Sequence, residues 1–288
     1  MHGIEIIKRY RTVYKNYVGV MWGVYKKKKE IKVVLRTGNS YKLIFTSASM
    51  YTQLIFSKNI NTVLIKLNDN HLQFSYKGKN ITVVEPWGDI NAVFGNEEYK
   101  FLDVKNEIVI DIGANIGDSP IYFALNNASK VVALEPYPYS YNLALENIKA
   151  NNLEDKITLL NAGYGEDRMT YVDPKFENTT GSDLKQQING TKIKILSLKT
   201  LLDTYNIENA VLKVDCEGCE YNLLKEDNDT LKKFKRIQIE FHYGYEKLKK
   251  KLEDSGFTVS YSKPAESLNK YATEQKMLVG YIYAKLDQ

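Results

Sequence analysis

Hydrophobic and polar positions follow different rhythms before and after residue 100. In the first stretch, Ile4 to Tyr25 carries apolar and aromatic residues at rough helical spacing. Short apolar segments separated by polar turns predict strands, which we place at 31–35, 64–67, 71–76 and 81–84. Residues 1–100 are therefore expected to form a small α+β appendage.

From Glu107 onward, short and nearly continuous apolar runs alternate with segments that suit helices. Apolar strands of this kind, separated by helices, favour a parallel sheet covered on both faces. Right-handed crossovers then make the fold a doubly wound α/β domain, expected over residues 101–288. No helix separates the last two apolar runs, so we expect them to pair antiparallel. The strands are expected at 108–110, 131–134, 157–160, 211–214, 237–239, 257–261 and 277–283, with helices from about 119 and over 139–151.

Charge is distributed unevenly between these two parts. The 288 residues carry a net charge of +5, with 43% hydrophobic and 26% charged residues, which is typical of a globular protein. Residues 1–100 hold 16 basic and 7 acidic residues, whereas residues 101–288 hold 24 and 28. The densest basic run, Lys26 to Lys29, is interpreted either as solvated surface or as a patch facing RNA, lipid headgroups or an acidic glycan.

Cysteine content and hydropathy bear on the compartment. Two cysteines are too few for a disulfide framework or an all-cysteine zinc site, so a reducing interior suits the chain. No apolar run approaches the ~20 residues that span a bilayer, and the first residues lack the apolar segment of a secretory signal. We therefore expect a cytoplasmic protein without a transmembrane segment.

A glycine loop follows the first strand of the main domain and opens a helix. Gly113, Asn115 and Gly117 lie at steps of two, and Asp111 precedes them. This spacing does not fit the dinucleotide fingerprint, so an NAD-dependent oxidoreductase is only a remote alternative. The loop favours a ligand that joins a nucleoside to an amino acid, because Asp111 suits an ammonium or sulfonium neighbour.

Glu135 ends the second strand, about 20 residues beyond the loop, where a carboxylate can accept both ribose hydroxyls. Strand, loop, helix and acid occur in the order that a nucleoside site needs. The competing interpretation is a solvated carboxylate at the end of an ordinary βαβ unit.

Three segments resemble the signature segments of FkbM-type class I methyltransferases. They are Val109–Gly117, Glu135–Pro138 with Asn147–Asn152, and Leu212–Glu220. The resemblance covers roughly residues 98–288. It implies S-adenosylmethionine as cofactor, a Rossmann-like seven-stranded sheet with an antiparallel last strand, and methyl transfer to oxygen. By this resemblance, Asp111, Gly113, Asn115 and Gly117 line the methionine and ribose, Glu135 holds the ribose, and Asn161 and Ala162 lie where the adenine edge is read.

Polar residues follow the fourth and fifth strands. Asp215 ends the fourth strand with Glu217 just beyond, and Glu240 and His242 share one side of the fifth. Ligands of open α/β sheets bind outside the carboxyl ends of strands, so we expect these four residues around the methyl acceptor. In one hypothesis, His242 or Asp215 takes the proton of the acceptor hydroxyl. In the other, a divalent cation binds Asp215 and Glu240; we favour the first, without a metal.

Three further features carry their own expectations. Glu220 is expected as an acid favoured by the dipole at a helix N-terminus. Cys216 and Cys219 are expected as small buried thiols rather than a redox pair. The stretch Met169 to Lys194 is long enough for a lid or hairpin. Glu98 and Tyr99 precede the first strand of the main domain and are expected to close over the cofactor.

The expected function is O-methylation of a hydroxyl on a sugar, glycan or small natural product. The first alternative is ribose methylation of RNA, with the basic front holding phosphates. Enzymes that methylate base nitrogens commonly carry an Asn/Asp-Pro-Pro-aromatic tetrapeptide at this place. This chain reads Asp215-Cys216-Glu217-Gly218 there, which favours ribose over base nitrogen within the RNA alternative. A non-catalytic protein that binds the cofactor is a further alternative.

Overall fold

The computed structural model describes residues 3–36, 38, 40–44, 54, 60–67, 71–86, 89–174, 190–268 and 276–286. The chain divides into two compact units, Met1–Glu98 and Tyr99–Gln288. Within the described ranges, no helix is long and apolar enough to cross a membrane.

The first unit contains two helices and two small sheets. The helical pattern at its start forms two helices, the first ending at Val13 and the second beginning after Asn16, whose side chain bonds to the following strand. Its Nδ2 donates to the Lys32 oxygen at 2.8 Å, and its Oδ1 accepts from the Val34 N–H at 2.8 Å. The elements are α1 (Gly3–Val13), α2 (Tyr17–Tyr25), a hairpin of β1 (Glu30–Val34) and β2 (Ser40–Ile44), an antiparallel sheet of β3 (Ile60–Leu67), β4 (His71–Tyr76) and β5 (Lys79–Val84), and the short helix η1 (Asn91–Gly95). The short helix η2 (Glu98–Leu102) begins at the last residue of this unit and continues into the second.

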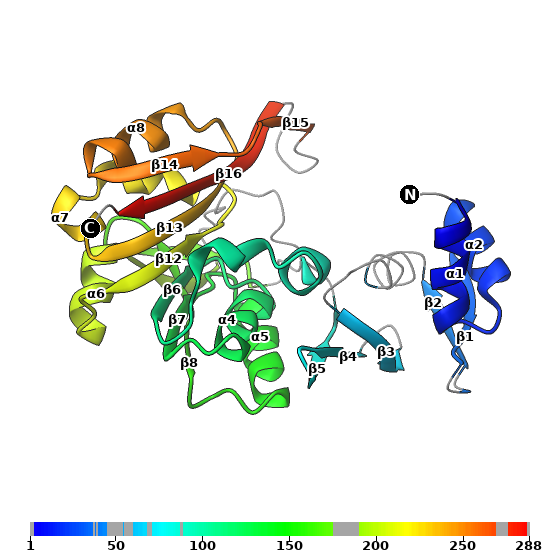
Figure 1. Ribbon diagram of the computed structural model, residues 1–288. Helices are drawn as coiled ribbons and strands as arrows, with labels where there is room; N and C mark the ends of the chain where they lie inside the picture. The colour runs from blue at the N-terminus through cyan, green and yellow to red at the C-terminus, as the bar shows by residue number, and fades with distance from the viewer. Residues whose placement is uncertain are drawn as a thin grey trace. The chain divides into compact units, whose positions relative to one another are not determined.

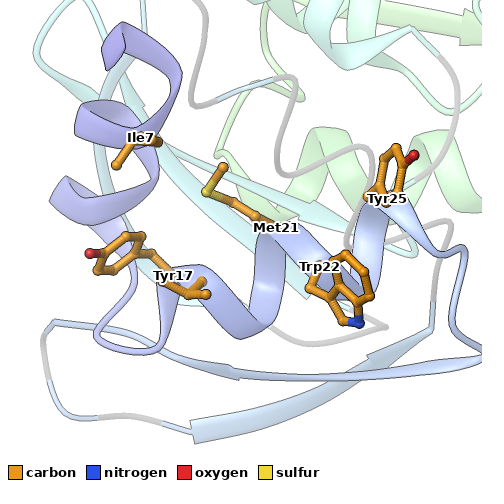
Figure 2. A pocket seen from close by; sticks show the side chains of 6 residues that line it. Ile7, Tyr17, Met21, Trp22 and Tyr25 are labelled. Atoms are coloured by element: carbon orange, nitrogen blue, oxygen red, sulfur yellow. The ribbon is translucent and has the colours of Figure 1, made fainter. Parts of the chain in front are cut away.

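Helix α2 packs on β1 through one face only. Val20 is fully buried, and a Cβ atom on Gly23 would lie 3.0 Å from the Ile31 side chain, so helix and strand approach closely. The opposite face of α2 leaves Trp22 and Tyr25 exposed, and Figure 2 shows them with Met21 and Tyr17 along the same helix.

The second unit is built on one large sheet. Its strand order is β14 (Phe257–Tyr261), β16 (Lys276–Leu286), β13 (Phe234–Phe241), β12 (Ala210–Val214), β6 (Ile108–Ile112), β7 (Lys130–Leu134) and β8 (Ile157–Leu160). Strand β16 is antiparallel to both of its neighbours, whereas β13, β12, β6, β7 and β8 pair in parallel. Figure 1 shows β16 between β14 and β13, and β15 (Ala265–Leu268) pairs with β16 as an addition to the seven strands. The expected α/β fold with an antiparallel last strand is confirmed.

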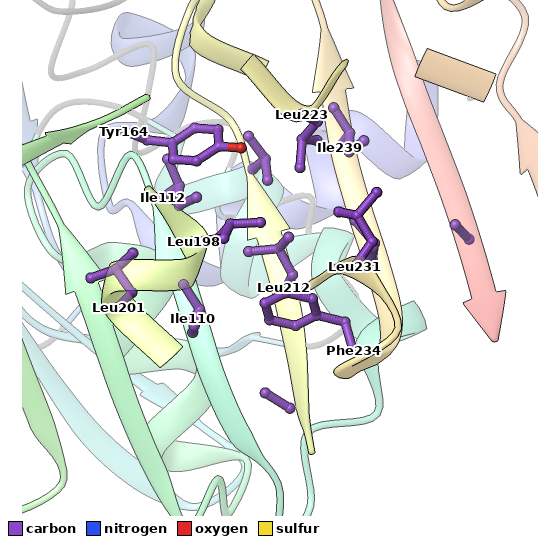
Figure 3. Packing of buried hydrophobic residues seen from close by; sticks show 14 of the residues in the cluster. Ile110, Ile112, Tyr164, Leu198, Leu201, Leu212, Leu223, Leu231, Phe234 and Ile239 are labelled. Atoms are coloured by element: carbon purple, nitrogen blue, oxygen red, sulfur yellow. The ribbon is translucent and has the colours of Figure 1, made fainter. Parts of the chain in front are cut away.

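Helices cover the large sheet, and the side chains of its strands alternate between its two faces. The helices α4 (Asp118–Leu125) and α5 (Pro138–Ala150) pack against strands of the β6–β8 side. The helices α6 (Leu198–Tyr205), η3 (Cys219–Lys225), α7 (Asn228–Leu231) and α8 (Glu246–Asp254) contribute to a buried cluster with the sheet. In this cluster Leu198 and Leu201 of α6 lie near Ile110 and Leu212 (Figure 3). Because side chains alternate along a strand, Asp111 and Lys213 point to the opposite face.

A small second sheet follows β8. It contains β9 (Ala162–Tyr164), β10 (Arg168–Val172) and β11 (Thr191–Leu196), in the order β10-β11-β9. Strands β10 and β11 are antiparallel, so the stretch Met169 to Lys194 has the paired arms of a hairpin. Its residues 175–189 lie outside the described residues.

Candidate active site

The loop between β6 and α4 takes a backbone conformation that favours glycine. Gly113, Asn115 and Gly117 have φ angles of +87°, +49° and +89°. A Cβ atom on Gly113 would lie 1.8 Å from the Asp215 backbone oxygen, and one on Gly117 would lie 3.2 Å from the Cα of Ala144 in α5. The two glycines therefore let the main chain of the loop approach β12 and α5 more closely than any side chain would permit.

The Glu135 carboxylate joins this loop to the exit of β7. It is 3% exposed, and it accepts the Asn115 N–H at Oε2 and the Tyr137 N–H at Oε1, each at 2.9 Å. Burial raises the pKa of Glu135 to about 8, although the two backbone N–H groups oppose the change. The sequence-predicted acid therefore lies against the glycine loop rather than in open solvent.

Asn161 and Ala162 follow β8 on the same side. The Asn161 Nδ2 donates to the backbone oxygens of Glu135 at 2.9 Å and Pro136 at 3.0 Å. Ala162 is buried in the hydrophobic cluster. The structure thus brings Asn161 next to Glu135, where its side-chain amide braces the end of β7.

A buried ion pair lies beneath the glycine loop, and sequence reasoning missed its cationic member. The sheet register pairs Lys213 on β12 with Asp111 on β6, and the Lys213 Nζ is 3.1 Å from the Asp111 Oδ1. The same Nζ donates to the Gly113 backbone oxygen at 2.6 Å, while the Ser119 Oγ donates to the Asp111 Oδ2 at 2.7 Å. The ammonium group beside Asp111 is therefore the protein's own.

Burial and charge act against each other in this pair. Burial of the Asp111 carboxyl raises its pKa, and the Lys213 ammonium opposes that change. Burial would lower the pKa of Lys213, but the Asp111 and Asp215 carboxylates outweigh burial and raise it. A lysine within an otherwise apolar strand was the available signal, because a buried lysine needs a partner.

Asp215 follows β12, and its backbone is hydrogen-bonded to the end of β6, where the glycine loop begins. Its N–H donates to the Ile112 oxygen at 3.0 Å. The Tyr99 hydroxyl donates to the Asp215 Oδ2 at 3.2 Å, and the Lys213 Nζ lies 3.9 Å from the same oxygen. The Asp215 side chain is 18% exposed, so a phenol and an ammonium hold a carboxylate that solvent still reaches.

His242 lies between two carboxylates at the end of β13. Its Nδ1 is 3.0 Å from the Glu220 Oε1, and its Nε2 is 3.0 Å from the Glu217 Oε2. Burial alone would lower the pKa of His242, but the hydrogen bonds to Glu217 and Glu220 outweigh burial and raise the pKa to about 11. At neutral pH the ring is an imidazolium that donates to both carboxylates.

Glu220 has a role beyond the one expected from sequence. It lies in the first turn of η3, as expected of an acid at a helix N-terminus, but its carboxylate is fully buried and is bonded to His242. Its Oε1 accepts the His242 N–H at 3.0 Å as well as bonding to the ring, and its Oε2 accepts the Gly218 N–H at 2.8 Å. Glu220 therefore fixes the position of His242.

The cysteines correct an expectation from sequence. Cys216 and Cys219 are joined by a disulfide, so the expectation of two buried thiols is wrong. Both residues are half-buried. The disulfide closes the short turn that contains Glu217 and Gly218.

The four residues expected around the acceptor come together at one edge of the sheet. Asp215, Glu240 and His242 each offer a carboxylate oxygen or ring nitrogen, and these atoms all lie within 4.8 Å of one another. Glu217 joins them through its bond to the His242 Nε2. Oxygen and imidazole ligands suit divalent cations, but an imidazolium has no lone pair to offer a metal.

The strand order, the glycine loop after β6 and the acid after β7 define a class I methyltransferase, whose cofactor is S-adenosylmethionine. Residues 111–261 match the family model described as the methyltransferase FkbM domain. The chain belongs to this family, and the resemblance of its three sequence segments is confirmed. The remote oxidoreductase alternative is excluded by the family match.

Curated relatives match over short stretches. The chain is 36% identical over 56 residues to a tRNA(Phe) (4-demethylwyosine(37)-C(7)) aminocarboxypropyltransferase of Pyrococcus horikoshii, covering 19% of this chain and 20% of that one. It is 43% identical over 54 residues to a ribosomal protein L11 methyltransferase of Carboxydothermus hydrogenoformans, covering 19% and 18%. The chain thus spans about a fifth of the length of these relatives.

Solved structures resemble the chain at a distance. A putative transferase from Pyrococcus horikoshii has a TM-score of 0.41 and 15% identity over 86% of this chain and 88% of that one. TYW2 of M. jannaschii, solved in complex with AdoMet, has a TM-score of 0.37 and 19% identity over 78% and 91%. The fold and family assignments therefore rest on the topology and the family match of this chain itself.

Proposed function

We propose that this methyltransferase methylates a hydroxyl oxygen of a sugar, glycan or small natural product. The observation that carries the proposal is the group Asp215, Glu217, Glu240 and His242 at the strand edge beside the glycine loop. Hydroxyl groups donate hydrogen bonds to carboxylates and accept them from a protonated histidine, so a polyhydroxyl acceptor matches this mixture of groups.

The residues around the glycine loop fit the cofactor. Gly113, Asn115 and Gly117 would bind the methionine and ribose through the main chain of a loop whose left-handed backbone at Gly113 and Gly117 favours glycine. Each Glu135 oxygen accepts one backbone N–H and retains acceptor capacity for a ribose hydroxyl. When bound, S-adenosylmethionine supplies a methyl group on a positively charged sulfur.

The remaining predicted cofactor residues act less directly in this proposal. Asp111 supports the loop through Lys213, which holds the Gly113 backbone oxygen. Asn161 holds the main chain at Glu135, and Ala162 is buried in the hydrophobic cluster. Asn161 and Ala162 thereby shape the side of the site where the adenine is proposed to lie.

Asp215 is the proposed general base. Of the two candidates, His242 is already protonated at neutral pH, so only the Asp215 carboxylate accepts the proton of the acceptor hydroxyl. Tyr99 and Lys213 both contact the Oδ2 of the Asp215 carboxylate. Glu217, Glu240 and His242 would orient the remaining hydroxyls of the acceptor.

A divalent cation on Asp215 and Glu240 is the mechanistic alternative. The His242 imidazolium, held by Glu217 and Glu220, would face such a cation with a positive charge, which favours the metal-free route. Dialysis against EDTA followed by addition of Mg²⁺ or Mn²⁺ separates the two. An unchanged rate supports the metal-free route, and a rate restored only by the metal contradicts it.

RNA ribose is the second candidate acceptor, because the exposed run Lys26 to Lys29 suits phosphates. A labelled-methyl transfer screen over glycans, small polyols, lipids, proteins and RNA tests both candidates. We expect label on a hydroxyl oxygen, no label with Gly113→Ala, and a loss of about 10²- to 10⁴-fold with Asp215→Asn. Label on a nitrogen of a base or a protein would contradict the proposed reaction.

A further inference from the structure

The helices α1 and α2 present an apolar surface to solvent. The side chains of Ile7, Tyr17, Val18, Met21, Trp22 and Tyr25 line a groove of about 550 Å³ (Figure 2). Val18 is 64% exposed, Trp22 53% and Tyr25 75%, and Ile4 in α1 is 71% exposed. A surface helix ordinarily turns polar residues to water, so a contiguous apolar surface of this kind marks an interaction site.

This surface belongs to helices that are firmly held from their other side. Tyr14 and Val20 are fully buried, and Gly23 lies against Ile31 so closely that a Cβ atom would be 3.0 Å from its side chain. The exposed residues are therefore the outer face of packed helices, and the inner face of α2 already has its partner in β1.

Basic residues surround the apolar surface. Lys26 to Lys29 follow α2 directly and are all exposed, and residues 4–29 hold eight basic residues and one acidic residue. The Lys26 Nζ lies 4.9 Å from the centre of the Trp22 ring and 5.3 Å from that of Tyr25. Aromatic rings with lysine ammonium groups at their border are the pattern of a surface that meets lipid headgroups and acyl chains together.

We propose that the α1–α2 surface docks on an anionic phospholipid bilayer. Ile4, Val18, Trp22 and Tyr25 enter the boundary between headgroups and acyl chains, and Lys26 to Lys29 contact the anionic headgroups. The aliphatic residues favour lipid over RNA. Bases stack on aromatic rings and phosphates bind lysines, but exposed Ile4 and Val18 find no matching group on a nucleic acid. The proposal does not rest on the identity of the methyl acceptor.

Vesicle flotation of the full chain tests the proposal. The chain should float with phosphatidylcholine vesicles that contain phosphatidylserine, less with phosphatidylcholine alone, and less at high salt. Trp22→Ser with Tyr25→Ser should weaken partitioning at least about tenfold, as should replacement of Lys26 to Lys29 by Gln. The control for the aromatic pair is Leu145→Ser with Tyr171→Ser in the second unit, where these side chains are 41% and 42% exposed. The control for the lysine run is replacement of Lys247, Lys249, Lys250 and Lys251 by Gln. Both controls should bind as the parent chain does.

Tryptophan fluorescence gives an independent readout. The chain has two tryptophans, so Trp87→Phe leaves Trp22 as the sole reporter. Anionic vesicles should shift its emission to the blue. The proposal would be overturned if the folded chain did not partition onto anionic vesicles. It would also be overturned if single-stranded RNA, but not vesicles, shifted the Trp22 emission. A dimer in light scattering that disappears with Trp22→Ser and Tyr25→Ser, with no vesicle binding, would overturn it as well.

Discussion

Gly113 packs directly against the main chain of Asp215, with so little space that a Cβ atom on Gly113 would lie 1.8 Å from the Asp215 backbone oxygen. The contact follows from sheet register, because Ile112 at the end of β6 pairs with Val214 at the end of β12. The cofactor loop and the proposed general base are therefore parts of one packed structure, and a change in either one is expected to displace the other.

Gly113→Ala should abolish binding of S-adenosylhomocysteine and lower the thermal unfolding temperature. The substitution adds a clash with Asp215 to the cost of a left-handed backbone at φ +87°, which is about 1–2 kcal/mol for a residue with a Cβ atom. Calorimetric titration and a thermal melt measure the two effects. Gly19→Ala is the matched control, because a Cβ atom there would meet nothing within 4 Å. Unchanged affinity in Gly113→Ala would refute this account of the loop.

Lys213→Met should destabilise the second unit by about 3–5 kcal/mol, because it leaves the buried Asp111 carboxylate without its cation. Urea denaturation measures the loss. The double variant Lys213→Met with Asp111→Asn should lose less unfolding free energy than the sum of the two single variants, since it has no unpaired charge. Lys235→Met removes the partly exposed ion pair with Glu107, and it should cost at most about 1 kcal/mol. Additive losses in the double variant would show that Lys213 and Asp111 are not coupled.

Local pattern was sufficient to predict the sheet and the cofactor loop. The alternation of apolar runs and helical segments predicted each strand of the large sheet except the added β15, and the spacing of Gly113 and Gly117 predicted a loop between the first strand and its helix. These features depend on neighbours along the chain, where periodicity and glycine geometry carry the information.

The electrostatics of the site depend on residues that are distant in sequence. Lys213 meets Asp111 across a strand pair, and Glu220 meets His242 across 22 positions. Pattern reasoning placed His242 at the acceptor edge, but its protonation follows from two carboxylates whose direction only the fold determines. The sequence therefore predicted that these residues gather at the acceptor site, but it did not predict the Lys213–Asp111 ion pair or the positive charge of His242.

His242 should make stability depend on pH above neutrality. Its pKa is raised from the ordinary 6.5 to about 11 by Glu217 and Glu220, so the folded state holds a proton that the unfolded chain releases. The stabilisation is complete below pH 6.5 and is lost as pH rises to about 11. The free energy of unfolding should fall by about 1.4 kcal/mol per pH unit within this window.

Urea denaturation of the parent chain and of His242→Gln at several pH values between these limits measures the effect. The variant should lack this part of the slope. His71→Gln, in β4 of the first unit, is the control and should retain it. An identical slope in the parent chain and His242→Gln would mean that His242 is not the group that holds the proton.

The Cys216–Cys219 disulfide should support the position of Glu217, because it closes the turn between the two ends of Glu217-Gly218. Alkylation of the unfolded chain should find no free thiol before reduction and two after it. Loop-closure entropy for so short a ring predicts a loss of about 2 kcal/mol in unfolding free energy on reduction. Hydrogen exchange at 216–220 should quicken as Glu217 loses its fixed contact with His242. The variant with Ser at both cysteines should behave like the reduced chain and be insensitive to reductant. Two reactive thiols in protein never exposed to reductant would contradict the disulfide and its support of Glu217.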